Sequence, residues 1–267
     1  MRTSIVDRVL ALTKLGFSNP GEFFERIGFI VETRLDHFYT ARDSYKPDDM
    51  ESMIGHLEGE LQFDIASEVG SETAMQIEQL LRDTKVQLQT DAPQHFASDY
   101  AFGRLCFALA RAVKPEVIVE TGVSLGFSST FLLAALDENG SGKLHSVDLP
   151  PLGDNSDEYT GSAIPKDLKK NWTLHRGTVR QMLPQVIKQQ TGSISLAVFD
   201  SLHTYKTMKF ELDTLSKYGK GSALVLVDDI QDNRAFAEWV SSPSVVFFRA
   251  VKKLENKSLF GIAIVDL

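Results

Sequence analysis

The sequence predicts an α/β fold with a doubly wound, mostly parallel sheet of seven strands, an antiparallel hairpin at the C-terminal end, and a helical N-terminal extension. Three observations predict it. Apolar β-branched runs alternate with helical patterns from about residue 95 onward, the last two apolar runs are separated by only a few polar residues, and the first 95 residues show helical periodicity. We therefore divide the chain into an N-terminal helical region, 1–95, and a main domain, 96–267.

The N-terminal region contains a well-marked helix start at Asn19-Pro20-Gly-Glu22. The helix that follows has one wide apolar face, made of Phe23, Phe24, Ile27, Ile30, Val31 and Leu35. Further helices are expected from Ser71 to about Leu88 and from Ala97 to Val113. An aromatic face of this size needs a partner surface, which is either the main domain, with the helix as a lid, or a second subunit in a homodimer.

The main domain is expected to contain strands near 117–121, 144–148, 172–176, 195–200, 222–228, 244–249 and 259–265. Helices between the first five predict parallel pairing with helices on both faces of the sheet. The last two strands are joined by the polar stretch 252–257, which is too short for a crossover helix, so an antiparallel hairpin is expected there.

Composition excludes several classes of function. A net charge of −8 and a sequence pI near 5.3 argue against a nucleic-acid substrate, because phosphate binding depends on clustered Lys and Arg. The two densest basic runs, Lys166–Lys170 and Lys252–Lys253, are interpreted as solvated faces. Small neutral or cationic substrates fit better.

The chain has the composition of a globular protein with a sizeable core, since 43% of its 267 residues are hydrophobic. Its single cysteine, Cys106, excludes an intrachain disulfide. No apolar stretch approaches the roughly 20 residues of a membrane helix, and Asp7 and Arg8 interrupt any signal-peptide core. These observations favour a cytoplasmic protein.

The run 117–129 joins a buried strand to a glycine turn and a helix start. Gly122 and Gly126 punctuate the turn, and Ser128 and Ser129 stand where a helix needs an N-cap. This order of elements is typical of a nucleotide-type cofactor site, although an ordinary strand-to-helix turn would have the same pattern.

The charge at this turn favours one type of cofactor. Glu120 ends the strand, where a carboxylate would repel the pyrophosphate of a dinucleotide but would suit an ammonium or sulfonium group. The positive end of the following helix can bind the carboxylate of the same ligand. Asp148, 22 residues after Gly126, is placed to accept the ribose hydroxyls. This combination describes S-adenosylmethionine better than NAD.

The pattern Glu120-Thr-Gly122-x-x-x-Gly126-x-Ser-Ser129 resembles motif I of the class I S-adenosylmethionine-dependent methyltransferases. Ser124 stands where many members have a central glycine, as in the catechol-type and small-molecule O-methyltransferase branches. The resemblance covers roughly residues 95–267 and implies the Rossmann-like methyltransferase fold with its antiparallel terminal strand. It assigns cofactor binding to Glu120, Gly122, Ser124, Gly126, Ser128, Ser129, Asp148 and Thr178.

Two later strand patterns end in acidic residues. Asp200 closes the run 195–200, and Asp228 and Asp229 follow the run 222–227. The carboxyl ends of parallel strands meet at one edge of the sheet, so these carboxylates should lie close together and repel one another unless a cation or hydrogen-bond donors compensate them. Oxygen-only ligands favour Mg²⁺, with Ca²⁺ or Mn²⁺ as alternatives.

The set Asp200, His203, Asp228 and Asp229 resembles that of the macrocin-type sugar O-methyltransferases and, more loosely, of cephalosporin-hydroxylase-like and rhamnosyl O-methyltransferases. The resemblance implies that Asp200, Asp228 and Asp229 bind a divalent cation and that His203 is the general base. Two alternatives compete with these roles: His203 as a hydrogen-bonded structural residue, and Asp229 as the N-cap of a helix that begins near Asn233 or Arg234.

Two segments are expected to shape the pocket. The long polar loop from Pro150 to Pro165 is either a lid or binding element or a disordered segment. Thr178 and Gln181 form a capping-box pattern after the third strand, and the resemblance places Thr178 near the adenine.

The expected function is methyl transfer from S-adenosylmethionine to a hydroxyl of a small molecule or sugar, assisted by a divalent cation, with His203 or Asp200 accepting the proton. Three alternatives stay open: a metal-independent N- or O-methyltransferase, an NAD(P)-dependent oxidoreductase, and a non-catalytic nucleoside-binding module. The sequence does not separate a sugar, a polyketide, a phenol or a lipid-linked glycan as the acceptor.

Overall fold

The computed structural model describes residues 5–39, 44–88, 99–152, 156–255 and 258–267. The predicted boundary near residue 95 and the predicted start of a helix at Ala97 lie outside these ranges. The described part of that helix, α6, runs from Tyr100 to Val113.

A single seven-stranded sheet forms the centre of the molecule, with the strand order β3-β2-β1-β4-β5-β7-β6. The strands from β1 to β5 are parallel, and β7 is antiparallel to both β5 and β6, which confirms the predicted sheet with its C-terminal hairpin. The strands are β1 (Val117–Thr121), β2 (Lys143–Asp148), β3 (Trp172–Arg176), β4 (Ile194–Phe199), β5 (Ser222–Val227), β6 (Val245–Lys252) and β7 (Leu259–Asp266).

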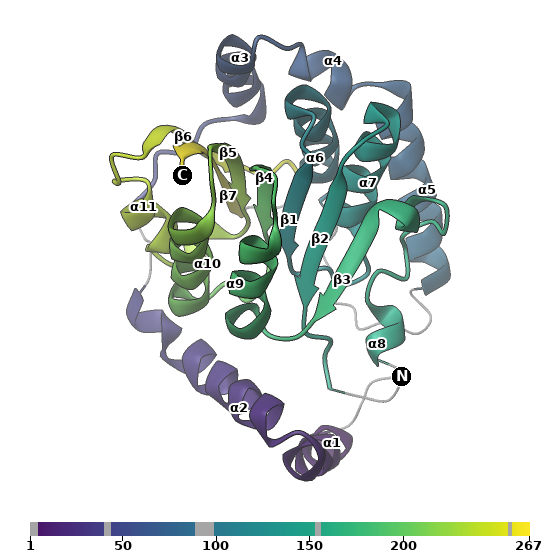
Figure 1. Ribbon diagram of the computed structural model, residues 1–267, viewed down its shortest axis with the longest axis vertical. Helices are drawn as coiled ribbons and strands as arrows, with labels where there is room; N and C mark the ends of the chain where they lie inside the picture. The colour runs from purple at the N-terminus through teal and green to yellow at the C-terminus, as the bar shows by residue number, and fades with distance from the viewer. Residues whose placement is uncertain (1–4, 40–43, 89–98, 153–155, 256–257) are drawn as a thin grey trace.

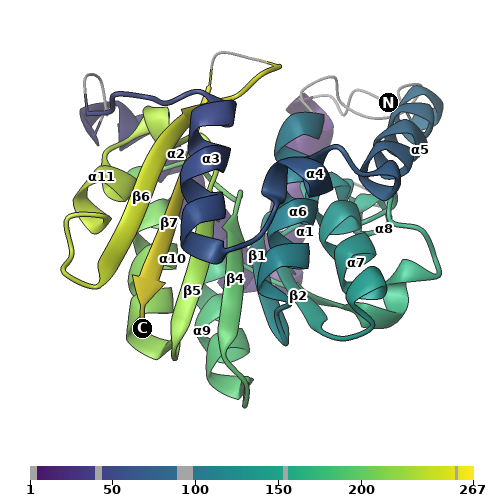
Figure 2. The ribbon, with the colours of Figure 1, turned by 90° about the horizontal axis from the view of Figure 1, so that it is seen from above.

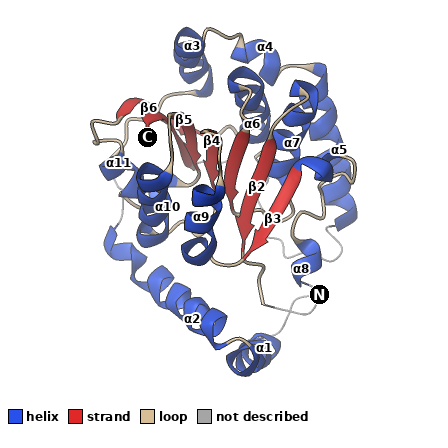
Figure 3. Ribbon diagram, viewed as in Figure 1, coloured by secondary structure: helices blue, strands red, loops and turns tan. Residues whose placement is uncertain are grey.

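Helices cover both faces of the sheet (Figures 2 and 3). Side chains alternate between the faces along each strand. In β1, Ile118 packs in the core that α6 and α7 share, whereas Val117 and Val119 pack in the opposite core. The α-helices of the main domain are α6, α7 (Phe127–Asn139), the short α8 (Ser156–Tyr159), α9 (Val179–Gln189), α10 (Tyr205–Tyr218) and the short α11 (Ala235–Trp239).

Part of the N-terminal region belongs to the core of the main domain. The helices α3 (Met50–Leu61), α4 (Ile65–Val69) and α5 (Glu72–Leu88) lie on the side of α6 and α7 (Figure 2). Met53, Leu57, Ile65 and Leu81 are fully buried in the same core as Phe131 of α7. These helices therefore extend the helical layer on one face of the sheet rather than forming a core of their own.

The first two helices, α1 (Ile5–Ser18) and α2 (Pro20–Leu35), lie apart from that layer. As predicted, Asn19 caps α2 by accepting a hydrogen bond of 3.2 Å from the backbone N–H of Glu22. Figure 1 shows α2 (purple) crossing the end of the sheet toward which the parallel strands point. It continues into a short 3₁₀ turn, η1 (Asp36–Tyr39).

The outer surface of these two helices is rich in apolar side chains. Among the side chains that the structure describes here, seven are exposed: Leu10, Phe17, Phe24, Ile30, Val31, Leu35 and, in η1, Phe38. Within the described ranges, no helix is both long enough and apolar enough to cross a bilayer.

Candidate active site

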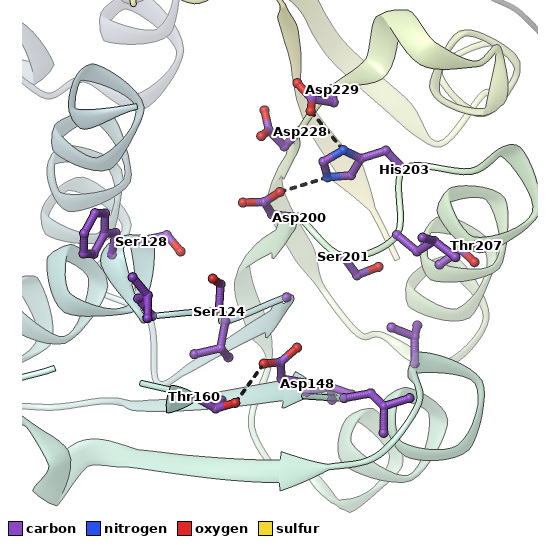
Figure 4. Close-up of a pocket in the computed structure, with 18 of the residues that line it drawn as sticks. Ser124, Ser128, Asp148, Thr160, Asp200, Ser201, His203, Thr207, Asp228 and Asp229 are labelled. Atoms are coloured by element: carbon purple, nitrogen blue, oxygen red, sulfur yellow. Dashed lines mark hydrogen bonds and ion pairs between the residues drawn. The ribbon is translucent and has the colours of Figure 1, made fainter. Parts of the chain in front are cut away.

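A cavity of about 810 Å³ lies at the carboxyl ends of the parallel strands. It is lined by the glycine turn after β1, by the loops after β2, β4 and β5, and by parts of α2 and α6. Figure 4 shows the cavity with Ser124 and Asp148 on one side and the acidic cluster of Asp200, Asp228 and Asp229 on the other. Ligands of open α/β sheets bind at this edge.

The glycine turn has a backbone that other residues would strain. Gly122 has a φ of +79°, and a Cβ there would lie 1.8 Å from the carbonyl oxygen of Asp200. Gly126 has a φ of +91°, and a Cβ there would lie 2.6 Å from the side chain of Ile164. Both positions therefore require glycine. Gly122 lets the turn approach the loop after β4, and Gly126 lets it approach the loop after β2. Ser124, between them, lines the cavity.

The helix α7 begins differently from the prediction. It starts at Phe127, and its N-cap position is Gly126, which has no side chain to bond the backbone. Ser128 and Ser129 lie in the first turn and donate to the carboxylate of Glu120, at 2.8 and 2.7 Å. The prediction that these serines cap the helix is wrong, because their hydroxyls bond the buried carboxylate of Glu120, in the strand that precedes the turn.

Glu120 is fully buried and does not line the cavity. A third hydroxyl, that of Ser146 in β2, donates to it at 2.7 Å. Burial raises the pKa of Glu120 to about 7, although the three hydroxyl donors oppose the shift. This position does not match the predicted contact with a cationic ligand: Glu120 fixes the turn and the start of α7 from behind. Ser129 is equally buried, whereas Ser128 reaches the cavity.

Asp148, at the end of β2, lies in the cavity wall. Burial raises the pKa of its carboxyl group, and hydrogen bonds from the backbone N–H groups of Ser124 and Val123 oppose that shift. The hydroxyl of Thr160 lies 3.4 Å from Oδ2 (Figure 4). The carboxylate is thus held against the glycine turn, with one side toward the cavity.

Thr178 also lines the cavity and is almost completely buried. It is the N-cap of α9, and its hydroxyl accepts a hydrogen bond of 3.2 Å from the backbone N–H of Gln181. The role of Thr178 as the N-cap is confirmed, and of the two bonds of the predicted capping box this is the one that the described structure shows. The predicted proximity of Thr178 to an adenine stays a proposal.

The described part of the loop between Pro150 and Pro165 packs on the glycine turn. Its Gly161 N–H donates to the carbonyl of Ser124, and its Ala163 N–H donates to the carbonyl of Leu125, both at 2.9 Å. Tyr159, in the short helix α8 (Ser156–Tyr159), lines the cavity together with Thr160. This arrangement fits a binding element; the residues 153–155 lie outside the described ranges.

The three predicted acids all line the cavity. Asp200 follows β4, and Asp228 and Asp229 follow β5. The backbone of Asp229 has the left-handed helical conformation, with a φ of +49°, and its side chain makes no cap hydrogen bond. The helix α11 has Arg234 at its N-cap position, and Oδ1 of the preceding Asn233 accepts a hydrogen bond of 2.8 Å from the N–H of Ala235. The alternative of Asp229 as the N-cap of this helix is therefore wrong.

His203 lies between two of these carboxylates (Figure 4). Its Nε2 is 3.0 Å from Oδ1 of Asp200, and its Nδ1 is 2.9 Å from Oδ2 of Asp229. Burial alone would lower the pKa of His203, but these two hydrogen bonds outweigh it and raise the pKa to about 11. Bonded in this way, the ring is an imidazolium and has no free lone pair, which does not fit the predicted role of general base.

Lys253 is a site residue that the sequence analysis missed. It directly follows β6, and its Nζ lies 2.5 Å from Oδ1 and 2.6 Å from Oδ2 of Asp228, and 3.4 Å from Oδ1 of Asp229. Only 6% of its side chain is exposed, so the prediction of a solvated face is wrong for Lys253, although it holds for Lys252. The strand alternation was the available signal: Val251 and Lys253 are buried, and Lys252 between them is exposed.

The metal prediction can be tested against this geometry. Among the described residues, two groups have ligand atoms within 4.8 Å of one another: Asp200 with His203 and Asp228, and His203 with Asp229 and Asp232. Neither is the predicted trio of acids. Both contain His203, whose two ring nitrogens already bond carboxylates, and Lys253 bonds both oxygens of Asp228. The donor set, as arranged, does not fit a divalent cation.

The apolar part of the cavity comes from helices that carry no recognisable motif. Phe29 of α2, Tyr100 and Phe102 of α6, and Phe131 of α7 line it, and Arg26 of α2 adds a cation. Sequence reasoning missed these residues because only the tertiary packing of the helices brings them to the strand ends.

Comparison with protein families gives a match over the part of the chain that contains the glycine turn and the strand-end acids. Residues 119–230 match the family model of a methyltransferase domain. This segment is therefore similar to a methyltransferase domain. The match extends from β1 to the end of β5 and includes the glycine turn, Asp148 and the acidic cluster. A sequence search of curated proteins finds no match.

Solved structures share the fold of the methyltransferase domain. An O-methyltransferase from Bacillus cereus, in complex with SAH, is 16% identical, with a TM-score of 0.56 over 73% of this chain and 91% of that one. TomG, an O-methyltransferase of tomaymycin synthesis from Streptomyces achromogenes in complex with SAM, is 20% identical, with a TM-score of 0.56 over 74% and 91%. The SAH-bound methyltransferase PaMTH1 from Podospora anserina is 13% identical, with a TM-score of 0.51 over 68% and 86%.

Proposed function

We propose that the protein is an S-adenosylmethionine-dependent O-methyltransferase that acts on a hydroxyl of a small molecule, sugars included. One observation carries the proposal: a single cavity of about 810 Å³ connects the glycine turn and Asp148 with the cluster around Asp200 and His203. Such a volume accommodates a nucleoside cofactor and a small acceptor side by side. The solved methyltransferases that share the fold in complex with SAM or SAH support the choice of cofactor.

The cofactor is proposed to lie along the glycine turn. Asp148 would accept the hydroxyls of the ribose, and Thr178 would lie near the adenine, because both residues line the same wall of the cavity. The backbone of residues 122–126 and the start of α7 would hold the methionine part, with Ser124 and Ser128 at the surface. Glu120 and Ser129 contribute from the second layer, by fixing the turn.

The acceptor is proposed to bind at the acidic end of the cavity. Methyl transfer needs the hydroxyl oxygen in line with the sulfonium methyl group, so the main contribution of the protein is to hold both reactants at attack distance. Asp200 would accept the proton as the bond forms. His203, bonded to both Asp200 and Asp229, would fix the direction of the carboxylate that takes the proton, while the methyl group passes from the sulfonium sulfur to the hydroxyl oxygen and leaves S-adenosylhomocysteine.

The expected divalent cation is not part of this mechanism. Asp200, Asp228 and Asp229 were predicted to bind Mg²⁺, but Asp228 is bonded to Lys253, and Asp200 and Asp229 are bonded to His203. We therefore propose the metal-independent form of the reaction. The narrower resemblance to macrocin-type sugar O-methyltransferases stays a hypothesis about the acceptor.

The aromatic face of α2 suggested a homodimer, and this also stays a prediction. Arg26 and Phe29 of this helix line the cavity, which supports the lid interpretation, whereas Phe17 and Phe24 are exposed by 90% and 70%, which leaves a surface for a partner.

The test is a methyl-transfer assay with methyl-labelled S-adenosylmethionine and a panel of phenols, catechols, sugars and amines, each with and without EDTA. Label on an acceptor oxygen in the presence of EDTA is the expected result. Label on nitrogen would replace the proposal by an N-methyltransferase, and hydride transfer from NAD(P)H without methyl transfer would replace it by an oxidoreductase.

A further inference from the structure

We propose that the ammonium group of Lys253 is a permanent cation of the acceptor site. It holds the carboxylates of Asp228 and Asp229 in position, the role that a divalent metal ion was expected to have here. The inference rests on the proposed function, because it concerns the acidic end of the same cavity. Lys253 acts through the two carboxylates and is therefore a positioning residue.

The contacts of Lys253 are those of a cation in a carboxylate site. Its ammonium group bridges both oxygens of Asp228, at 2.5 and 2.6 Å, and lies 3.4 Å from Oδ1 of Asp229. The side chains of Lys253 and Asp228 are exposed by only 6% and 9%. A lysine is rarely buried to this extent unless a charged partner compensates it, and the same holds for the aspartate.

Two of the three negative charges of the cluster are compensated without an added ion. Three carboxylates, those of Asp200, Asp228 and Asp229, face two cationic side chains, His203 and Lys253. Each carboxylate bonds at least one of the two cations. A divalent ion bound to Asp228 would lie within a few ångströms of the ammonium group, where like charges repel strongly in a site with little water.

The backbone explains how a lysine reaches this position. Lys253 follows the edge strand β6, and its N–H donates to the carbonyl of Ser258 at 3.0 Å, which closes the end of the hairpin. The antiparallel pairing of β6 with β7, and of β7 with β5, places this end of β6 near the carboxyl end of β5, where Asp228 and Asp229 begin. The hairpin thus supplies the cation, and the parallel strands supply the acids.

The experiment is a calorimetric titration of EDTA-treated full-length protein with Mn²⁺ alone. Wild-type protein is expected to bind no Mn²⁺ in the micromolar range. Lys253→Met removes the ammonium group and leaves Asp228 unpaired, so it is expected to bind Mn²⁺ at least about 100-fold more tightly than wild type. Lys253→Arg keeps the charge and should stay insensitive to Mn²⁺. Lys252→Met, at the exposed neighbour, is the matched control and should behave as wild type.

The melting temperature provides a second readout. Lys253→Met should melt below wild type in EDTA and recover on addition of Mn²⁺, whereas a merely structural loss would not respond to the ion. Micromolar binding of Mn²⁺ by wild-type protein would overturn the inference, even if Lys253→Met fails to fold. Failure of a folded Lys253→Met variant to bind Mn²⁺ would also overturn it. Titration with S-adenosylhomocysteine in the same samples tests the proposed function separately, since that ligand needs neither Lys253 nor the metal.

Discussion

Arg180, in the first turn of α9, forms an ion pair of 2.7 Å with Glu32 of α2. Glu32 is buried, and it also accepts a hydrogen bond of 2.8 Å from the hydroxyl of Thr207 and one from Thr204. Burial would raise the pKa of Glu32, but these donors outweigh it and lower the pKa. A charged group with three partners fixes α2 across the mouth of the cavity that Arg26 and Phe29 line.

Replacement of Glu32 by alanine should release α2 from the domain. Hydrogen bonds to a charged group contribute about 1.5–3 kcal/mol each, and the loss of the carboxylate leaves Arg180 and two hydroxyls without this partner. Amide hydrogen exchange in α2 should become faster by about tenfold or more, because local opening then requires less free energy. Thr33→Ala, at an exposed position of the same helix, is the control. Unchanged exchange in Glu32→Ala would mean that the helix is held mainly by other contacts.

Replacement of Asp148 by alanine should weaken binding of S-adenosylhomocysteine by about 10- to 100-fold, the loss expected for hydrogen bonds from two ribose hydroxyls to a carboxylate. Calorimetry measures the effect directly. Asp157→Ala removes an exposed carboxylate nearby, one that pairs with Arg176, and should bind as wild type does. Equal affinity in both variants would remove Asp148 from the cofactor site.

Replacement of Asp200 by asparagine should lower kcat by about 10² to 10⁴ while the affinity for S-adenosylhomocysteine changes little, because the proposed role of Asp200 is proton acceptance in the transition state. Single-turnover kinetics with a hydroxyl acceptor, beside a titration with the cofactor product, separates the two effects. If kcat is retained, another group must accept the proton.

Glu120 should make the protein less stable as the pH rises through neutrality. Its pKa is raised from 4.5 to about 7 by burial, so the folded state binds a proton between these values that the unfolded state has lost. The contribution to stability is complete below pH 4.5 and is lost as the pH rises through 7, with a slope of at most about 1.4 kcal/mol per pH unit.

Glu120→Gln should flatten this part of the stability curve, measured by urea unfolding at pH 5, 6, 7 and 8. Part of the slope should persist, since burial also raises the pKa of Glu211 to about 7. Glu158→Gln, at an exposed position, should leave the curve as in wild type. A curve that keeps its full slope in Glu120→Gln would show that Glu120 is ionised throughout.

The sequence predicts most of the fold because its strands are short, apolar and well separated. The predicted strand 117–121 agrees with β1 at both ends, and the short link after β6 required a hairpin. The positions of Asp200, Asp228 and Asp229 follow from the same logic, since they end parallel strands. A linear pattern shows which strand end a residue occupies and therefore which edge of the sheet it reaches.

What the sequence does not reveal depends on contacts between distant segments. Glu120 was expected to face a ligand, but its carboxylate is buried and bonded by hydroxyls from α7 and β2. His203 was expected to be a base, but the second carboxylate, Asp229, comes from the next strand and keeps the ring charged. Lys253 was read as part of a surface run, because only the pairing of β6 brings it to Asp228.

The central claim is that the cavity binds S-adenosylmethionine. The most direct measurement is calorimetric titration of the full-length protein with S-adenosylhomocysteine, in EDTA and then with Mg²⁺, with NAD as the control ligand. The account predicts binding in the micromolar range, unchanged by Mg²⁺, and no binding of NAD. Absence of binding by S-adenosylhomocysteine, together with a clear signal for NAD, would contradict it.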